Sequence, residues 1–274
     1  MYKGIDVSEH QGTIDWKRVK KAGCRFAVLR SVKRDGRTDI QFWANARGCY
    51  ANDIPYEVYR YTYAVLPTEA LEEAGQVIRL LQSQGKRSGR IWWDVEDKSL
   101  EPLGREVLTG LIKTAENTIT GAGYEFGIYT GQYFYDAGFF DTGAFQCPVW
   151  IARYPVSRSF SFEENPPSEE YRPKTKQPLF AWQYTSKGRI DGIDRPVDLD
   201  ICYMPFWKTE KEYYLNAVFH GTSLSAALES IGVDGSYRHR EDIAAANRIA
   251  DYRGTAGQNT RLLELLRTGR LVMP

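Results

Sequence analysis

Residues 58–96 read VYRYTYAVLPTEALEEAGQVIRLLQSQGKRSGRIWWDVE, and this stretch decides the fold. Two runs rich in β-branched and aromatic residues, at 58–64 and 90–96, flank a segment at 68–84 whose apolar residues recur at helical spacing. The pattern predicts a strand, a helix and a second strand. Strands joined in this way run parallel in one sheet, because a parallel pair needs a long crossover connection.

The same alternation extends over the first 204 residues. Further strands are predicted at 4–7, 26–30, 126–130, 149–154, 179–185 and 198–204, and further helices at 16–22, 40–50 and 101–120. Eight strands with crossover helices predict an α/β fold whose sheet closes into a TIM-like (β/α) barrel. After Thr130 the connections are rich in Pro, Ser and Gly and show little helical periodicity. We therefore expect an irregular barrel whose late helices are missing.

Charge and hydropathy exclude two classes of protein. The 36 Lys+Arg and 35 Asp+Glu residues leave a formal charge of +1, whereas nucleic-acid binding through phosphate neutralisation needs clustered excess base. No apolar run approaches the roughly 18 residues of a membrane span, so no membrane insertion is expected. The N-terminus lacks the charged head and apolar stretch of a secretory signal, so we expect the chain to occupy a cytoplasm first.

Cysteine and histidine spacing predicts neither disulfides nor a metal site. The four cysteines are widely spaced without a C-x-x-C motif, and we expect free thiols. None of the three histidines stands at a ligand spacing with a cysteine, which argues against zinc. No metal or organic cofactor is expected.

A second domain of different character follows the predicted barrel. The strand pattern ends near Met204 and a charged connector follows, so we predict a barrel at 1–207, a linker at 208–214 and a small, mainly helical domain at 215–274. Apolar residues at helical spacing mark three segments of that domain. The first contains Leu224, Leu228 and Ile231, the second contains Ile243 and Ile249, and the third contains Leu262 and Leu266.

The fourth predicted strand carries two acidic residues on one face. Side chains alternate along a strand, so Asp94 and Glu96 share a face with Trp92, with the two Cα atoms roughly 6.6 Å apart. Adjacent carboxyls raise each other's pKa, and desolvation by an indole adds to the effect. The carboxyl end of a barrel strand is where such enzymes place catalytic groups. A solvated strand end is the alternative interpretation.

Two further acidic residues occupy equivalent places. Asp6 lies near the end of the first strand, and Asp198 alternates with aliphatic residues in Val197-Asp-Leu-Asp-Ile201. A strand packed outward on its aliphatic face would aim Asp198 and Asp200 into the barrel, where acidic side chains are costly unless functional or paired. A structural ion pair of Asp6 or Asp198 with Arg30 is the alternative.

Several collinear motifs resemble glycoside hydrolase family 25, the lysozymes that include many phage endolysins. The motifs are GIDVSEHQGTIDW at 4–16, WWDVE at 92–96, GIYT at 127–130, VWIARY at 149–154, AWQYTS at 181–186 and VDLD at 197–200. The resemblance implies an irregular β/α barrel that cleaves the β-1,4 bond between N-acetylmuramic acid and N-acetylglucosamine in bacterial peptidoglycan.

Carried over by position, the resemblance implies a catalytic carboxyl cluster. Glu96 is expected to be the general acid that protonates the leaving oxygen, and Asp94 to orient the substrate acetamido group or stabilise positive charge. Asp6 and Asp198 are expected to position the site. Inversion, retention and assistance by the substrate acetamido group all stay open.

Sugar rings stack on aromatic faces, which makes several side chains candidates for substrate binding. The candidates within or beside the motifs are Tyr61, Tyr63, Tyr129, Tyr154 and Gln183. An aromatic stripe that only fills the core is the alternative. Two positions depart from the family pattern: Glu57 stands where Gly is frequent, and Asp200 stands where Asn is frequent. The resemblance therefore does not predict the substrate contacts near these two positions.

The C-terminal segment resembles, less specifically, wall-binding modules of Gram-positive lysins. GTSL at 221–224, AAAN at 244–247 and RLVMP at 270–274 are similar to parts of the LysM pattern. The sequence therefore predicts an endolysin that waits in the host cytoplasm, acts on Gram-positive peptidoglycan and binds the wall through residues 215–274. A barrel that binds glycan without cutting it is the alternative, with the C-terminal domain forming a homo-oligomer. A chitinase is disfavoured because its D-x-x-D-x-D-x-E strand is absent.

Overall fold

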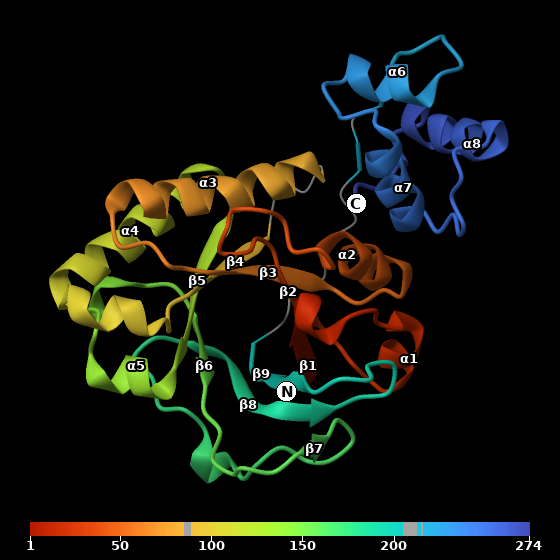
Figure 1. The fold of residues 1–274 in the computed structure, drawn as a ribbon. Coiled ribbons are helices and arrows are strands. Elements are labelled where there is room, and N and C mark those ends of the chain that lie inside the picture. The colour runs from red at the N-terminus through yellow and green to blue at the C-terminus, as the bar shows by residue number, and fades with distance from the viewer. Residues whose placement is uncertain (85–88, 205–212, 215) are drawn as a thin grey trace.

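Eight strands close into a barrel in the computed structural model, which describes residues 1–84, 89–204, 213–214 and 216–274 (Figure 1). Six neighbouring strands are parallel and follow one another in chain order. These strands are β1 (Tyr2–Val7), β2 (Ala27–Arg30), β3 (Tyr56–Tyr61), β4 (Arg90–Asp94), β5 (Glu125–Gly131) and β6 (Val149–Ala152). Then β8 (Leu179–Arg189) and β9 (Val197–Cys202) complete the ring. The α/β barrel predicted from the sequence is confirmed.

The last strand runs against the direction of its neighbours. β8 pairs parallel with β6, whereas β9 is antiparallel to both β8 and β1. The expectation of parallel strands is therefore wrong for β9. Residues 190–196 are too few for the crossover that a parallel pair requires, so the chain turns back directly. A short strand, β7 (Phe160–Ser161), pairs with β8 outside the ring.

Helices cover the first half of the barrel and become sparse in the second. Four helices follow the early strands, namely α1 (Trp16–Lys21), α2 (Phe42–Ala51), α3 (Pro67–Ser83) and α4 (Arg105–Gly121). The six-residue α5 (Gln132–Ala137) follows β5, and between it and β9 the only helical segments of the described chain are the 3-10 turns at Thr142–Ala144 and Glu169–Tyr171. The predicted loss of late helices is confirmed.

Two apolar layers hold the barrel together. Outward-facing strand residues such as Ile5, Val58 and Trp93 pack with the covering helices in one large core. Inward-facing aromatic residues, including Trp92, Trp150 and Phe180, fill the barrel axis in a second cluster. Strand alternation therefore separates structural packing outside from an aromatic interior that supports the carboxyl end of the barrel.

The C-terminal region forms three helices with a core of their own. They are α6 (Leu224–Ser230), α7 (Tyr237–Ala246) and α8 (Ala256–Arg267), which gather at one side of the barrel in Figure 1. Arg47 of α2 pairs with Asp242 of α7 at 3.1 Å, and Arg248 pairs with Asp53 at 3.0 Å. The helical character predicted for this region is confirmed.

Other expectations concern the linker, the cysteines and membrane spans. The predicted linker at 208–214 lies mostly outside the described residues, which resume at Tyr213, so the domain boundaries stay a prediction. The four cysteines are free thiols, and Cys24, Cys49 and Cys202 are buried. In the described part of the chain, every helix is too short or too polar to cross a bilayer.

Candidate active site

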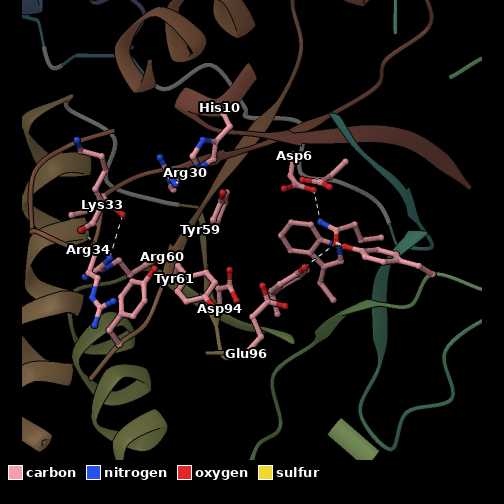
Figure 2. A pocket seen from close by; sticks show the side chains of 17 residues that line it. Asp6, His10, Arg30, Lys33, Arg34, Tyr59, Arg60, Tyr61, Asp94 and Glu96 are labelled. Atoms are coloured by element: carbon pink, nitrogen blue, oxygen red, sulfur yellow. Dashed lines mark hydrogen bonds between the residues drawn. The ribbon is translucent and has the colours of Figure 1, made fainter. Parts of the chain in front are cut away.

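A cavity of about 360 Å³ opens at the carboxyl ends of the parallel strands (Figure 2). All nine residues that the sequence analysis selected line it: Asp6, Tyr61, Tyr63, Asp94, Glu96, Tyr129, Tyr154, Gln183 and Asp198. Tyr61 and Asp94 are the last residues of β3 and β4, so strand convergence gathers positions that are far apart in sequence. Trp92 shares the inward face with Asp94 but is not among the residues that line the cavity.

Asp94 and Glu96 form the first part of the carboxyl cluster. The sheet register places Asp94 between Tyr61 of β3 and Tyr129 of β5, and Glu96 follows just beyond the strand. Burial, with the neighbouring Glu96 charge next, raises the pKa of Asp94 well above its ordinary range. Burial, with the Asp97 charge next, raises the pKa of Glu96 to about 7. Glu96 therefore exchanges its proton near neutral pH.

Asp94 also retains an unused acceptor. Within the described residues, Asp94 Oδ1 is buried and has no hydrogen-bond partner. Buried polar atoms normally have partners, so an orphaned carboxyl oxygen in a cavity is a candidate contact for a ligand N–H or O–H. Arg60 lowers the pKa of Asp94, but this effect is smaller than those of burial and Glu96.

Asp6 and Asp198 face each other across the β1–β9 pair, with Asp200 buried deeper. Burial raises the pKa of all three carboxyls, and the charge of Asp200 adds to the effect on Asp6. Trp150 Nε1 donates a hydrogen bond of 2.8 Å to Asp200 Oδ1. The proposed alternative of an ion pair with Arg30 is wrong, because Arg30 pairs with Glu9 and Asp39 at 2.6 Å each.

Gln183 connects the aromatic residues to the carboxyl cluster. Its Oε1 accepts hydrogen bonds from the Tyr129 hydroxyl at 2.8 Å and from the Tyr154 hydroxyl. Its Nε2 donates to Asp6 Oδ2 at 2.7 Å. Both ends of the side-chain amide are thus engaged, so it fixes Asp6 and both phenols in defined positions.

Tyr61 and Tyr63 form an aromatic pair in the lining of the cavity. Their ring centroids are 4.8 Å apart, with the planes inclined by 31°. The Tyr61 hydroxyl donates to Asp97 Oδ2 at 3.2 Å. Tyr154 is 48% exposed at the rim, whereas Tyr129 is buried. The aromatic residues therefore run from the floor of the cavity to its mouth.

The basic residues of the site were not among the site residues predicted from the sequence. His10, Arg30, Lys33, Arg34 and Arg60 also line the cavity, and Figure 2 shows them apart from Asp6 and Glu96. Three of them lie in or directly after β2. The cationic run RSVKRDGR at 30–37 lies at the carboxyl end of that strand, and this position was a signal that could have found them.

The two departures from the family pattern lie below the cavity. Glu57 is buried near the amino ends of the strands, where its Oε2 accepts from Trp92 Nε1 at 2.6 Å. Gly127 makes room for that indole, because a Cβ atom there would lie 2.5 Å from the Trp92 ring. Neither Glu57 nor Asp200 is among the residues that line the cavity.

The site has the features of an acid–base site for a polar ligand. It combines carboxyls of raised pKa with aromatic faces, the combination that glycoside cleavage uses. Among the described residues, no group of three or more His, Cys, Asp or Glu side chains is arranged to hold a metal ion.

Comparison with known proteins gives one family and several relatives. The family described as Glycosyl hydrolases family 25 matches residues 5–193. Lysozyme M1 of Streptomyces globisporus is 27% identical over 209 residues, which cover 72% of this chain and 66% of that protein.

Two solved structures share the barrel. The catalytic domain of endolysin ply40, from bacteriophage P40 of Listeria monocytogenes, is 25% identical with a TM-score of 0.59, covering 74% of this chain and 93% of that chain. The modular autolysin LytC of Streptococcus pneumoniae, in complex with a synthetic peptidoglycan ligand, is 26% identical with a TM-score of 0.62. The match covers 74% of this chain and 46% of LytC.

Proposed function

The chain belongs to glycosyl hydrolases family 25 and is a glycoside hydrolase, and we propose that it cleaves peptidoglycan with Glu96 as the general acid. The bond is the β-1,4 linkage between N-acetylmuramic acid and N-acetylglucosamine. The similarity to Lysozyme M1 and to the catalytic domain of endolysin ply40 supports this substrate. The observation that carries the proposal is the half-buried Glu96 carboxyl, whose pKa is raised to about 7 beside the buried Asp94.

The carboxyls have different roles because their surroundings differ. Glu96 has access to the cavity and donates its proton to the leaving glycosidic oxygen. The free Oδ1 of Asp94 accepts from the substrate acetamido N–H or stabilises positive charge in the transition state. Asp6, fixed by Gln183, and Asp198 position the sugar that is cleaved.

The biological setting is a second part of the proposal. The likeness to a phage endolysin supports a lysin that stays in the host cytoplasm until the membrane is permeabilised. The helical C-terminal region, with its own core, then holds the enzyme on the Gram-positive wall, since tethering raises the local concentration on an insoluble substrate. Sedimentation of the full Glu96→Gln chain with walls tests this, compared with the same variant ending at residue 207. Equal sedimentation of both would contradict wall binding by the C-terminal region.

The test of the activity compares the wild type with Glu96→Gln on purified Gram-positive peptidoglycan. Reduction and mass spectrometry identify the new ends. We expect reducing muramic acid ends from the wild type alone, and a loss of at least about 10²-fold in the variant. Because the acid must be protonated, wild-type kcat/KM should fall as the pH rises through about 7. Intact glycan bound tightly by both proteins would indicate a binding protein instead.

A further inference from the structure

Lys33 and Arg34 form a basic edge of the cavity that the mechanism does not use, here called the basic ledge. They lie on a hairpin after β2, closed by the bridge between Val32 and Thr38. Figure 2 shows both side chains on the far side of Tyr61 from Glu96. The cavity therefore has carboxyl groups at one end and cations at the other.

The ledge carries positive charge that the protein does not neutralise fully. Two other cations of the cavity have ion-pair partners, since Arg30 pairs with Glu9 and Asp39, and Arg60 pairs with Glu73 at 3.0 Å. Lys33 reaches only Glu9, at 3.8 Å, and shares that carboxylate with Arg30. Within the described chain, Arg34 has no carboxylate within 4.0 Å, and its charge acts from a greater distance on Asp97, whose pKa it helps to lower.

The ledge is also held in place before any ligand arrives. The buried Arg60 Nη1 donates to the carbonyl oxygens of Val32 at 3.3 Å and Lys33 at 3.1 Å. The Arg34 guanidinium lies over the Tyr63 ring, 4.4 Å from its centroid. A fixed guanidinium loses less conformational entropy on binding than a free one, so the arrangement favours recognition of a carboxylate.

We propose that the basic ledge binds a carboxylate of the peptide stem attached to muramic acid, an inference that rests on the proposed function. The glycan backbone itself is uncharged, and the stem is the part of peptidoglycan that carries free carboxylates. It is linked to muramic acid, the sugar next to the cleaved bond. With the sugar against Tyr61 and Tyr63, a stem carboxylate reaches the ledge and stays away from the carboxyl cluster, which would repel it.

The experiment combines a double variant with a chemically altered substrate. Lys33→Gln/Arg34→Gln is compared with the wild type on peptidoglycan stripped of phosphate polymers, before and after carbodiimide amidation of its carboxylates. On untreated peptidoglycan the variant should lose about tenfold in kcat/KM, mainly through KM, as expected for one or two charge-assisted contacts. On amidated peptidoglycan the two proteins should be equal. Raising the ionic strength should raise KM for the wild type more than for the variant.

Arg37→Gln is the matched control, because Arg37 lies on the same hairpin, pairs with Asp35 and does not line the cavity. It should leave kcat/KM unchanged on both substrates. The proposal is overturned if the double variant cleaves untreated peptidoglycan as well as the wild type, or if its loss persists after amidation. Loss that persists on amidase-treated chains, which keep only the lactyl carboxylate, would overturn the assignment to the stem. If the wild type itself releases no ends, the proposed function fails instead.

Discussion

Glu57 and Asp94 are equally buried carboxyl groups in one barrel, each 3% exposed, but their surroundings are opposite. Glu57 lies near the amino ends of the strands and pairs with Arg90 at 3.4 Å, while accepting from Trp92. Asp94 lies at the carboxyl ends of the strands, where the like charge of Glu96 changes its pKa more than any other charge does. One end of the barrel satisfies its acid with a cation, and the other end places acids together.

The difference separates the stabilising end of the barrel from the reactive end. A buried carboxyl group with a cation and a hydrogen-bond donor beside it fixes the packing around it. Carboxyl groups that lie close together without a paired cation bind protons more tightly, and their ionisation lowers the free energy of unfolding. We therefore expect substitutions at the two ends to change stability in opposite directions.

The largest effect is expected from Arg90→Met. The variant removes the cation from the buried Glu57 and should lower the free energy of unfolding by about 3–5 kcal/mol. Denaturant unfolding at neutral pH measures the change. Glu125→Gln is the control, because it removes the half-exposed partner of Arg90 and should cost no more than about 1 kcal/mol. Equal stability of the two variants would break the comparison.

A gain of stability is expected from Glu96→Gln. The pKa of Glu96 in the folded chain, about 7, exceeds that of an unfolded glutamate, so proton binding by Glu96 stabilises the folded chain. This contribution to the free energy of unfolding is complete below about pH 4.3 and is lost as the pH rises through about 7. Glutamine does not titrate. The free energy of unfolding of the variant minus that of the wild type should therefore be about 1–3 kcal/mol larger at pH 8 than at pH 4.

Thermal unfolding of both proteins at several pH values checks this prediction. The difference in Tm should grow between pH 4.5 and 7 and remain constant above. A difference that does not change with pH would mean that Glu96 ionises in the folded chain as it does in the unfolded chain, and the reactive end would then resemble the stabilising end.

Strand periodicity predicted most of the barrel, and the resemblance to glycoside hydrolase family 25 selected the candidate site residues within it. Parallel strands end at one face of a closed sheet, so acids and tyrosines at strand ends had to meet, as Tyr61 and Asp94 do. The antiparallel β9 was missed because all eight strands were expected to be parallel, although the late connections were expected to lack helices. The strands predicted at 179–185 and 198–204 left about a dozen residues between them, which a crossover can span, whereas in the structure β8 extends to Arg189 and β9 begins at Val197.

Contacts between side chains of different elements could not be predicted from the sequence pattern. Glu57 was noted as a departure, but its partner Arg90 lies on the next strand, and no spacing rule connects the two. The basic ledge depends on the hairpin closed by Val32 and Thr38, and on Arg60, which donates hydrogen bonds to carbonyl groups of that hairpin. Such contacts arise from the tertiary fold rather than from local periodicity.

The smallest effect is expected from Asp200→Asn, which tests the comparison within the reactive end. Asp200 is fully buried, and burial and the charge of Asp198 raise its pKa well above the ordinary range. Asparagine keeps an oxygen to accept from Trp150 Nε1 and removes one of the crowded charges. Because a raised carboxyl pKa costs stability at high pH, the variant should be more stable than the wild type at pH 8, by about 1 kcal/mol. At pH 4 that advantage should shrink, and thermal unfolding at both pH values measures it. Destabilisation at both pH values would mean that Asp200 contributes through a structural hydrogen bond that asparagine does not replace, as Glu57 does at the other end of the barrel.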